Sequence, residues 1–582
     1  MLFECVESSR MVLERAVWEL FQNTLYEDGR RDSRIRHARD TARSARHWRK
    51  THTRDGTVCS ALSNRYRALV RTRGVNSAVC SRYPFVSWDE PTCMGFLSDT
   101  YLLESAAAET LYAEIKSVPI VDPHTHADLE EIVANDGWDD IWEVEGATDH
   151  YVWSMMRTRG IPERKITGDA SNKEKWLALA AEFPNFAGNP SYEWIHLDLK
   201  RRFGIEKPIS EATAESIWTE TKAQLATDTM RPQQLLADMN VELFCTTDDP
   251  TSSLEAHEEA ERAIDGVDVR PTWRLDRALH IGRDSWDEFV DDLEQATGTG
   301  VQSFSGFIEA LEQTHEYFHA HGCRASDLSL EQISTRPVSQ RRARTVYRKA
   351  LEGTNLTPDD VADFQAYLIE TVGRLNAARG WVTQLHLGAV RDYRDELFQT
   401  VGADAGGDVS KHSIDLADEL VYFLNEFDGE TDIVLYTVDP TQYPTITTIA
   451  RAFPNVSVGP AWWFNDSPYG IEEQLQYVGS VDLLANHAGM VSDSRKLLSY
   501  GSRFEMFRRT LANVVGEMVD RDRVAWHTPN TSSTIWPTSG RNRSTASSSH
   551  SCLRPELAAV ENTEHTYSSL PTAIVGTDDS AN

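Results

Sequence analysis

The chain of 582 residues is 40% hydrophobic and 9% aromatic, which is enough apolar material for a large buried core. Its formal net charge is −32. So acidic a surface repels nucleic acid and anionic membranes, and no apolar run reaches the about 18 residues of a membrane span. We therefore expect neither a nucleic-acid partner nor a membrane partner, and leave a homo-oligomer open.

The two ends differ in composition from the middle. Residues 1–93 carry a net charge of +6, with sixteen arginines and the single lysine Lys50. They are either a nucleic-acid-binding arm or, as we favour, an upstream stretch included by a wrong start codon, with Met94 as the real start. Residues 526–582 are rich in Ser, Thr and Pro over much of their length and show no periodicity, which predicts a disordered or frameshifted tail.

The middle, residues 94–525, has a net charge of −36. This charge is typical of an extreme halophile, in which salt screens the repulsion, although an ordinary acidic bacterial enzyme is the alternative. Of seven cysteines only Cys245 and Cys323 lie in this middle, and no spacing suggests a zinc knot or a disulfide framework. With no signal-peptide core at the N-terminus, we expect a cytoplasmic protein.

Short apolar runs alternate with helical stretches along the middle of the chain. The runs are 119–126, 241–249, 269–274, 323–327, 381–388, 432–439, 456–463 and 483–495. Strands that alternate with helices form parallel βαβ units, and eight of them close an α/β fold, the (β/α)8 TIM barrel, with its chemistry at the carboxyl ends of the strands. The rival, an open doubly wound sheet, needs a glycine-rich turn after the first strand, and residues 122–126 (DPHTH) contain no glycine.

Chemically capable side chains stand at those strand ends. They are His124, His126, Asp248, Asp249, Arg274, Asp327, His386, Asp439, Asp493 and Arg495. Residues 127–240, with helical patterns at 142–160, 172–183, 195–203 and 213–226, are too long for a simple crossover. We expect a helical insertion after the first strand that caps the barrel mouth, and a second one at 340–380.

Two pairs with a spacing of two residues carry the strongest chemical signal. His124 and His126 point to one face of a strand and can reach one divalent ion, although an isolated pair is more often structural. Asp493 and Arg495 share the same spacing, and Arg495 could bind an anionic substrate by a bidentate contact. A plain surface salt bridge is the alternative. The barrel hypothesis requires both pairs to converge on one pocket.

Three further groups have both a structural and a functional interpretation. In Asp149–Trp153, His150 and Tyr151 either belong to an amphipathic helix face or reach the substrate as proton-transfer groups. His386 ends a strand, with Arg391 nearby. Trp462 and Trp463 either form a core aromatic cluster or one wall of a sugar site.

Seven segments together resemble the uronate (glucuronate) isomerase family of the amidohydrolase superfamily, in the family's order and over about residues 94–525. They are 122–126 (DPHTH), 149–153 (DHYVW), 245–255 (CTTDDPTSSLE), 271–274 (PTWR), 384–391 (QLHLGAVR), 462–466 (WWFND) and 492–500 (SDSRKLLSY), the last followed by Arg503 and by Phe507–Arg509. Any one is weak evidence, but seven in order make chance an inadequate explanation.

The resemblance implies a metal-binding barrel that interconverts D-glucuronate and D-fructuronate, with D-galacturonate and D-tagaturonate as a second pair. It implies metal ligands at His124, His126 and Asp493, proton transfer by His150, Tyr151 and Asp493, and substrate-facing arginines at Arg391 and Arg495. Three departures stand out. Leu328 follows Ser326 and Asp327 where the family usually has histidine, Asp392 and Tyr393 replace an Asn-rich run, and the usual closing helix is not recognisable after Arg523.

The predicted mechanism is proton transfer through an enediol. We expect Asp493 to move the carbon-bound proton, Tyr151 oriented by His150 to move the oxygen-bound proton, and His124 or a divalent metal, zinc by its ligand set, to polarise the carbonyl. Arg495 or Arg391 would bind the carboxylate of the uronate. Arg274, Trp463 and His386 complete the expected substrate site. The alternatives are a metal-dependent hydrolase on the same barrel and an inactive relative kept for binding.

Overall fold

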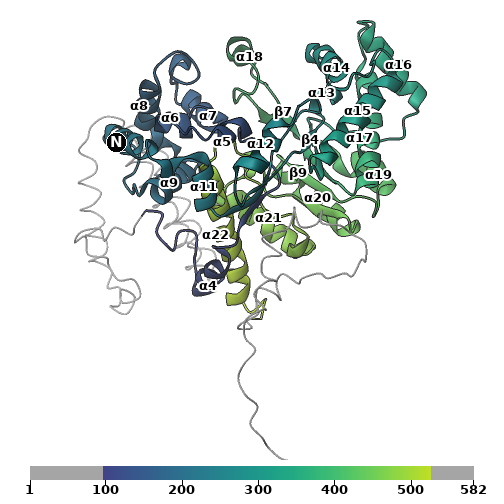
Figure 1. Cartoon of the computed structure of the whole chain (residues 1–582). Coiled ribbons are helices and arrows are strands. Elements are labelled where there is room, and N and C mark those ends of the chain that lie inside the picture. Colours follow the sequence, from purple (N-terminus) through teal and green to yellow (C-terminus); the bar gives the residue numbers. More distant parts are fainter. Residues whose placement is uncertain (1–95, 526–582) are drawn as a thin grey trace, which may run out of the picture. The chain divides into compact units, whose positions relative to one another are not determined.

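A computed structural model describes residues 96–525 of the chain. The predictions for residues 1–93, and those for residues 526–582, lie outside this range. Within it, parallel strands occupy the centre and helices surround them (Figure 1). None of the helices in residues 96–525 combines the length and the apolar character that crossing a lipid bilayer requires.

The strands follow the order expected of a barrel. They are β1 (Ile120–Asp122), β2 (Val241–Cys245), β3 (Asp268–Arg270), β4 (Trp273–Arg274), β5 (Ala325–Leu330), β6 (Val382–Leu387), β9 (Ile433–Thr437) and β10 (Val456–Val458). One sheet has the order β1-β2-β3 and another the order β10-β9-β6-β5-β4, and every pair in both is parallel. Strands β6 and β9 are buried at every position, as parallel strands packed on both faces are.

Backbone contacts join these sheets to each other. A parallel bridge at Trp273 links β4 to the end of β2, and another at His487 continues the order beyond β10. The chain then returns to its first strand, because the amide of Asp493 donates to the carbonyl of His124 at 3.1 Å. The predicted α/β fold of parallel strands is therefore confirmed, and its contacts follow the strand order of a (β/α)8 barrel.

Two predicted strands differ from the observed ones. The run 269–274 is divided into β3 and β4, because Pro271 has no amide to donate to a ladder. The run 483–495 forms no continuous strand. It begins with the 3-10 turn η6 (Leu484–Asn486) and then passes through two left-handed residues, Gly489 (φ +93°) and Asp493 (φ +48°).

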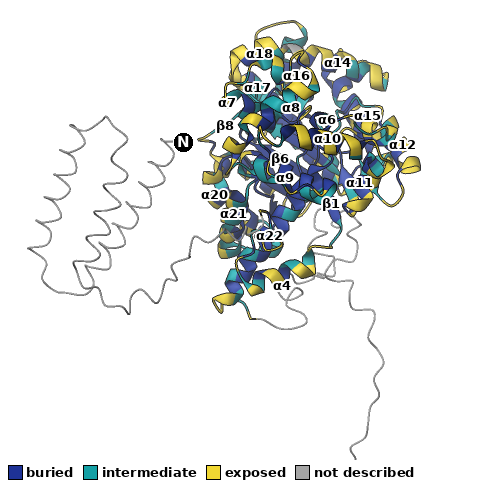
Figure 2. Ribbon diagram, turned by 90° about the vertical axis from the view of Figure 1, so that its left-hand side faces the viewer, coloured by how far each residue is buried: buried dark blue, intermediate teal, exposed yellow. Residues whose placement is uncertain are grey.

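Alternate side chains of the strands face two different cores. On β6 and β9, Leu385 and Leu435 pack outward against helices, whereas Val434 and Tyr436 face inward with Trp462. The helices that follow the strands are α12 (Glu255–Ala263), α15 (Phe304–Ala320), α17 (Pro358–Arg379), α19 (Leu416–Glu426), α20 (Tyr443–Ala452), α21 (Pro468–Val481) and α22 (Ser499–Asp520). Figure 2 shows β1 and β6 in dark blue among helices whose outer faces are exposed.

Residues 127–240 form the predicted helical insertion. Its helices are α5 (Leu129–Ala134), α6 (Ile141–Glu145), α7 (His150–Thr158), α8 (Asn172–Glu182), α9 (Pro190–Phe203), α10 (Ala214–Leu225) and α11 (Pro232–Asp238). The predicted helix 142–160 is in fact two helices, α6 and α7, because the Asp149 side chain caps the N-terminus of a second helix. Helix α9 starts earlier than predicted, since Asn189 caps it and Pro190 suits a first turn.

The second insertion and the remaining elements complete the described fold. Helices α16 (Gln340–Leu351) and α17 form the insertion predicted at 340–380. The others are α4 (Ala106–Ile115), α13 (Asp276–Leu279), α14 (Asp284–Thr297), α18 (Asp395–Val401) and the short hairpin of β7 (Ala389–Val390) and β8 (Val409–Ser410). Helices α6, α8 and α9 lie on one side of the barrel and α15, α16 and α17 on the other (Figure 1).

Candidate active site

The two histidines after β1 meet the aspartate of the last barrel segment. The Nε2 atoms of His124 and His126 lie 3.2 and 3.3 Å from Oδ1 of Asp493. The ligand atoms of these three residues all lie within 4.8 Å of one another. Hydrogen bonds between the backbones of the two segments hold this geometry, so the convergence is built into the barrel.

Asp493 is fixed in an unusual conformation. Its φ of +48° is left-handed, which non-glycine residues rarely adopt away from sites where the surroundings impose it. The indole Nε1 of Trp462 donates to its Oδ2 at 2.9 Å, so Oδ1 is left for the histidines. Burial would raise the pKa of Asp493, but hydrogen bonds to His124 and His126 outweigh it and hold the pKa well below its usual range.

The other nitrogen of each histidine faces a supporting group. Nδ1 of His126 lies 2.8 Å from the hydroxyl of Thr247, and Nδ1 of His124 lies 3.4 Å from Oδ2 of Asp327. Burial lowers the pKa of His126 to about 4, so its imidazole is neutral near pH 7. Two imidazoles oriented by such contacts, with a carboxylate between them, make a donor set that suits a divalent ion such as zinc.

Arg274 and His386 contact Asp327, directly behind the His124 ring of the histidine–aspartate cluster. Arg274 Nη1 lies 3.0 Å from Oδ2 of Asp327, and His386 Nδ1 lies 2.7 Å from Oδ1. His124, Asp327 and His386 also form a group of possible metal ligands. Both oxygens of Asp327 are already engaged, however, and all three side chains are buried, so the group is better suited to orient His124 than to hold a second ion.

His150 and Tyr151 begin α7 and lie at the barrel mouth. Their rings stack with centroids 4.8 Å apart, and the His150 ring meets the edge of Trp463 at 5.8 Å. Both ring nitrogens of His150 and the hydroxyl of Tyr151 are buried without a hydrogen-bond partner among the described residues. Buried polar atoms are nearly always paired, so these three atoms are free for a bound molecule.

The environment sets the protonation of this pair. Burial, reinforced by the charge of Arg495, lowers the pKa of His150 to about 4. Burial also raises the pKa of Tyr151 well above its ordinary value. At neutral pH the imidazole is therefore uncharged and the phenol carries its proton, which is the state needed to donate to a substrate oxygen.

Arg391 and Arg495 come together on one carboxylate. Both guanidinium groups reach Oδ1 of Asp404 at 3.7 Å, and each arginine side chain is about one quarter exposed. The guanidinium of Arg391 also lies over the ring of Trp463, 4.3 Å from its centre. The arrangement presents two partly exposed positive charges beside an aromatic wall, as an anionic sugar requires.

Asp404 was missed by the sequence analysis. It lies between α18 and β8, in a glycine-rich segment that gave no periodic signal. Helix α7 holds this segment in place. The hydroxyl of Ser154 donates to the carbonyl of Gly406 at 2.8 Å, and Arg157 donates to that of Ala405. The clustering of Gly402, Gly406 and Gly407 is the one sequence feature that could have indicated a tight turn there.

Position 328, where the family usually has histidine, lies in the outer core. The leucine that replaces the usual histidine is fully buried, and it packs with the outer core that also contains Leu385. Because side chains alternate along a strand, Asp327 points into the barrel and Leu328 away from it. In this structure, position 328 is therefore not part of the site.

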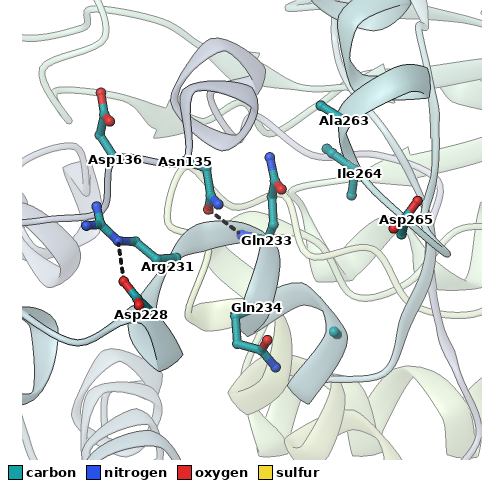
Figure 3. A pocket seen from close by; sticks show the side chains of 10 residues that line it. Asn135, Asp136, Asp228, Arg231, Gln233, Gln234, Ala263, Ile264 and Asp265 are labelled. Carbon is teal, nitrogen blue, oxygen red and sulfur yellow. Dashed lines mark hydrogen bonds and ion pairs between the residues drawn. The ribbon is translucent and has the colours of Figure 1, made fainter.

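Other strand-end carboxylates serve the local structure. Oδ1 of Asp439 accepts from the amide of Thr441 at 2.9 Å and caps the following turn. A hollow beside α5 and α11 contains none of the predicted site residues (Figure 3). In it, Gln233 N donates to Asn135 Oδ1 at 3.1 Å. Its polar groups contact one another, which gives it no independent chemical signal.

The barrel and its histidine–aspartate cluster define an amidohydrolase-like barrel protein with a possible metal site. The chain belongs to the glucuronate isomerase family, whose model matches residues 94–535. A uronate isomerase from Thermotoga maritima is 57% identical over 429 residues, 74% of this chain and 95% of that protein. Its crystal structure superposes with a TM-score of 0.73 over the same shares of both chains.

More distant relatives support the same family assignment. A uronate isomerase from Caldicellulosiruptor bescii is 37% identical over 436 residues, 73% of this chain and 93% of the relative. The crystal structure of a glucuronate isomerase from Caulobacter crescentus is 27% identical, with a TM-score of 0.69 over 72% of this chain and 89% of that one. The chain is thus an aldose–ketose isomerase by family.

Proposed function

We propose that this enzyme interconverts D-glucuronate and D-fructuronate, and also D-galacturonate and D-tagaturonate. The observation that carries the proposal is the meeting of His124, His126 and Asp493 in one cluster at the barrel mouth. The two arginines that share Asp404 and the unpaired groups of α7 supply the remaining parts of a uronate site. The family relatives support the same reaction.

In the proposed reaction, the carbonyl moves from C1 to C2 by two kinds of proton transfer. Asp493 removes the C2 proton, and the electron pair forms an enediol while the C1 oxygen gains a proton. Asp493 then returns its proton to C1, and the C2 hydroxyl loses its proton to leave the ketone. Tyr151, stacked on His150, moves the oxygen-bound protons.

The remaining residues bind the substrate or orient the groups that react with it. Arg391 and Arg495 hold the substrate carboxylate, and Trp463 forms a wall beside it. His124 polarises the carbonyl, and Asp327, with Arg274 and His386, keeps its ring oriented. When bound by His124, His126 and Asp493, a divalent metal, which we propose to be zinc, would supply Lewis-acid polarisation.

The first experiment tests the reaction and its base together. Full-length protein in high salt is incubated with each aldose uronate, and the ketose and the exchange of the C2 hydrogen in D2O are followed by NMR. We expect turnover that Asp493→Asn lowers by at least about 100-fold, the usual contribution of a general base. Asp439→Asn is the matched control, because Asp439 ends another barrel strand but contacts Thr441 and His412 rather than the histidine–aspartate cluster.

Two outcomes would overturn this assignment. Near-normal turnover and C2 exchange in Asp493→Asn would exclude Asp493 as the base. Hydrolysis of a dipeptide or lactone panel, with no ketose formed from either uronate, would instead favour the metal-dependent hydrolase.

The second experiment concerns the metal. We expect one divalent ion per chain by elemental analysis, and loss of most of it when His124 and His126 are both replaced by glutamine, because two of three ligands are removed. His412→Gln is the control, since His412 is largely exposed and its Nδ1 contacts Asp439 instead of the three proposed metal ligands. An equal metal content in all three proteins would contradict the ligand assignment.

The setting of the enzyme is a further part of the proposal. Cys323 is buried and forms no disulfide bond among residues 96–525, which suits a reducing cytoplasm. We propose that residues 94–525 form the catalytic part and that residues 127–240 cap its mouth. An assembly of several copies stays open.

A further inference from the structure

One buried lysine joins the segment that carries Asp493 to the helix that carries Tyr151. The ammonium of Lys496 lies 3.0 Å from Oε2 of Glu145 and 2.9 Å from Oδ2 of Asp149. All three side chains are at most 3% exposed. Lys496 follows Arg495 directly, so its position is tied to that of the substrate-binding and proton-transfer groups before it.

Asp149 uses its other oxygen to start helix α7. Its Oδ1 accepts from the amide of Tyr151 at 2.8 Å and from that of Val152 at 3.4 Å, which makes it the N-cap. One carboxylate therefore bonds both the lysine and the first turn of the helix. Any displacement of Lys496 would be passed to His150 and Tyr151 through a single side chain.

The charges around Lys496 distinguish the carboxylates beside it. The ammonium faces Glu145 on α6, Asp149 before α7 and Asp198 on α9. Burial raises the pKa of Glu145 and of Asp198, whereas at Asp149 the charges of Lys496, His150 and Arg503 together outweigh burial and lower the pKa. Lys496 and Asp149 therefore form a buried ion pair, and of the two carboxylates in contact with the ammonium only Asp149 also caps α7.

A buried ion pair is poor evidence of a gain in stability, because removing two charges from water costs about as much as their attraction returns. The position of this ion pair, between the segment of Asp493 and helix α7, is better explained by a role in orienting the two. We propose that Lys496 is a positioning residue that fixes His150 and Tyr151 relative to Asp493 and Arg495. This inference rests on the proposed isomerase function for its kinetic consequence, but its structural consequence can be measured independently.

The test compares the two carboxylates that Lys496 contacts. Asp149→Asn removes the charge of the carboxylate that both contacts Lys496 and caps α7, and Glu145→Gln is the matched control at nearly the same distance and burial but without the cap. We expect Asp149→Asn and Lys496→Met to lower kcat by about tenfold or more, because small misplacements of reacting groups cost up to about 100-fold. KM should change little, and Glu145→Gln should leave both constants nearly unchanged.

Hydrogen exchange of the amides in residues 149–158 gives a readout that needs no substrate. We expect faster exchange in Asp149→Asn and Lys496→Met than in wild type or Glu145→Gln. Should Lys496→Met fail to fold, the comparison of Asp149→Asn with Glu145→Gln still tests the positioning role. Equal effects of Asp149→Asn and Glu145→Gln on kcat and on exchange would overturn the proposal. If wild type converts no uronate while the exchange pattern holds, the isomerase function fails and the positioning contact stands.

Discussion

Individual residues in this protein separate into those that serve the site and those that serve the core, often within one strand. Asp493 and Trp463 both have left-handed φ values, +48° and +53°, which cost about 1–3 kcal/mol each. Both lie at the barrel mouth, where Trp462 and Arg391 contact them. Such strain persists only where surrounding contacts impose it, so these two positions are expected to tolerate substitution poorly.

A buried histidine far from the mouth makes stability depend on pH. His315 stacks on Trp381 with ring centres 3.7 Å apart and its Nε2 contacts Asn376 at 3.1 Å. Burial lowers its pKa to about 3. In the unfolded chain this histidine has a pKa near 6.5, so between about pH 6.5 and pH 3 it is protonated in the unfolded chain but not in the folded one. The free energy of unfolding therefore decreases as the pH falls through this range.

Replacing His315 measures how much of the decrease in the free energy of unfolding at low pH is due to this residue. Between pH 7 and pH 5 we expect the free energy of unfolding to fall by about 2 kcal/mol more in wild type than in His315→Gln, whose amide can still donate to Asn376. Urea unfolding at each pH measures the difference. An identical pH dependence for the two proteins would mean that His315 is protonated in the folded state.

At the scale of elements, two helices far apart in sequence approach so closely that only glycine fits between them. Helices α4 and α22 lie side by side (Figure 1). A Cβ at Gly516 of α22 would stand 2.7 Å from the amide nitrogen of Ala108 and 2.9 Å from its Cα. Because those are backbone atoms of α4, the two helices would have to separate.

Gly516→Ala therefore has two opposing effects on stability, one from helix propensity and one from packing. Alanine gains about 1 kcal/mol over glycine inside a helix, but overpacking against a rigid backbone costs about 1–3 kcal/mol. We expect a lower free energy of unfolding by denaturant titration. Gly501→Ala, on the same helix, would meet only side-chain atoms of Met239 and Arg202 at 3.2 Å and beyond, so it should be neutral or stabilising. Equal effects of both changes would contradict this account.

The elements themselves were largely predictable. Strands β6 and β9 and helices α8 and α10 lie close to their predicted positions, because each depends on a period of two or of 3.6 residues and on local caps. The predictions failed where a single residue interrupts a pattern, as Pro271 does between β3 and β4 and Asp149 does before α7. Such interruptions follow from one hydrogen bond, which periodicity does not record.

For the whole molecule, the charge of −32 predicts a dependence on salt. Like charges repel more strongly in the compact state than in the unfolded chain, and salt at 1 M screens them within about 3 Å. We expect Tm to rise by several degrees between 0.1 M and 2 M KCl, measured by calorimetry. A Tm that stays constant or falls would exclude the halophilic interpretation.

The sequence by itself determined the α/β class, the order of the strands and the helical insertion, and it predicted the residue types of the candidate site. These follow from patterns confined to a few neighbouring residues and from motifs that keep the family's order. Only the tertiary structure decided that Arg274 and His386 face Asp327, that Leu328 points away from the site, and that Asp404 meets both arginines. Those contacts depend on how the barrel closes and where its long insertions return, so groups far apart in the chain are brought together by packing that no local pattern encodes.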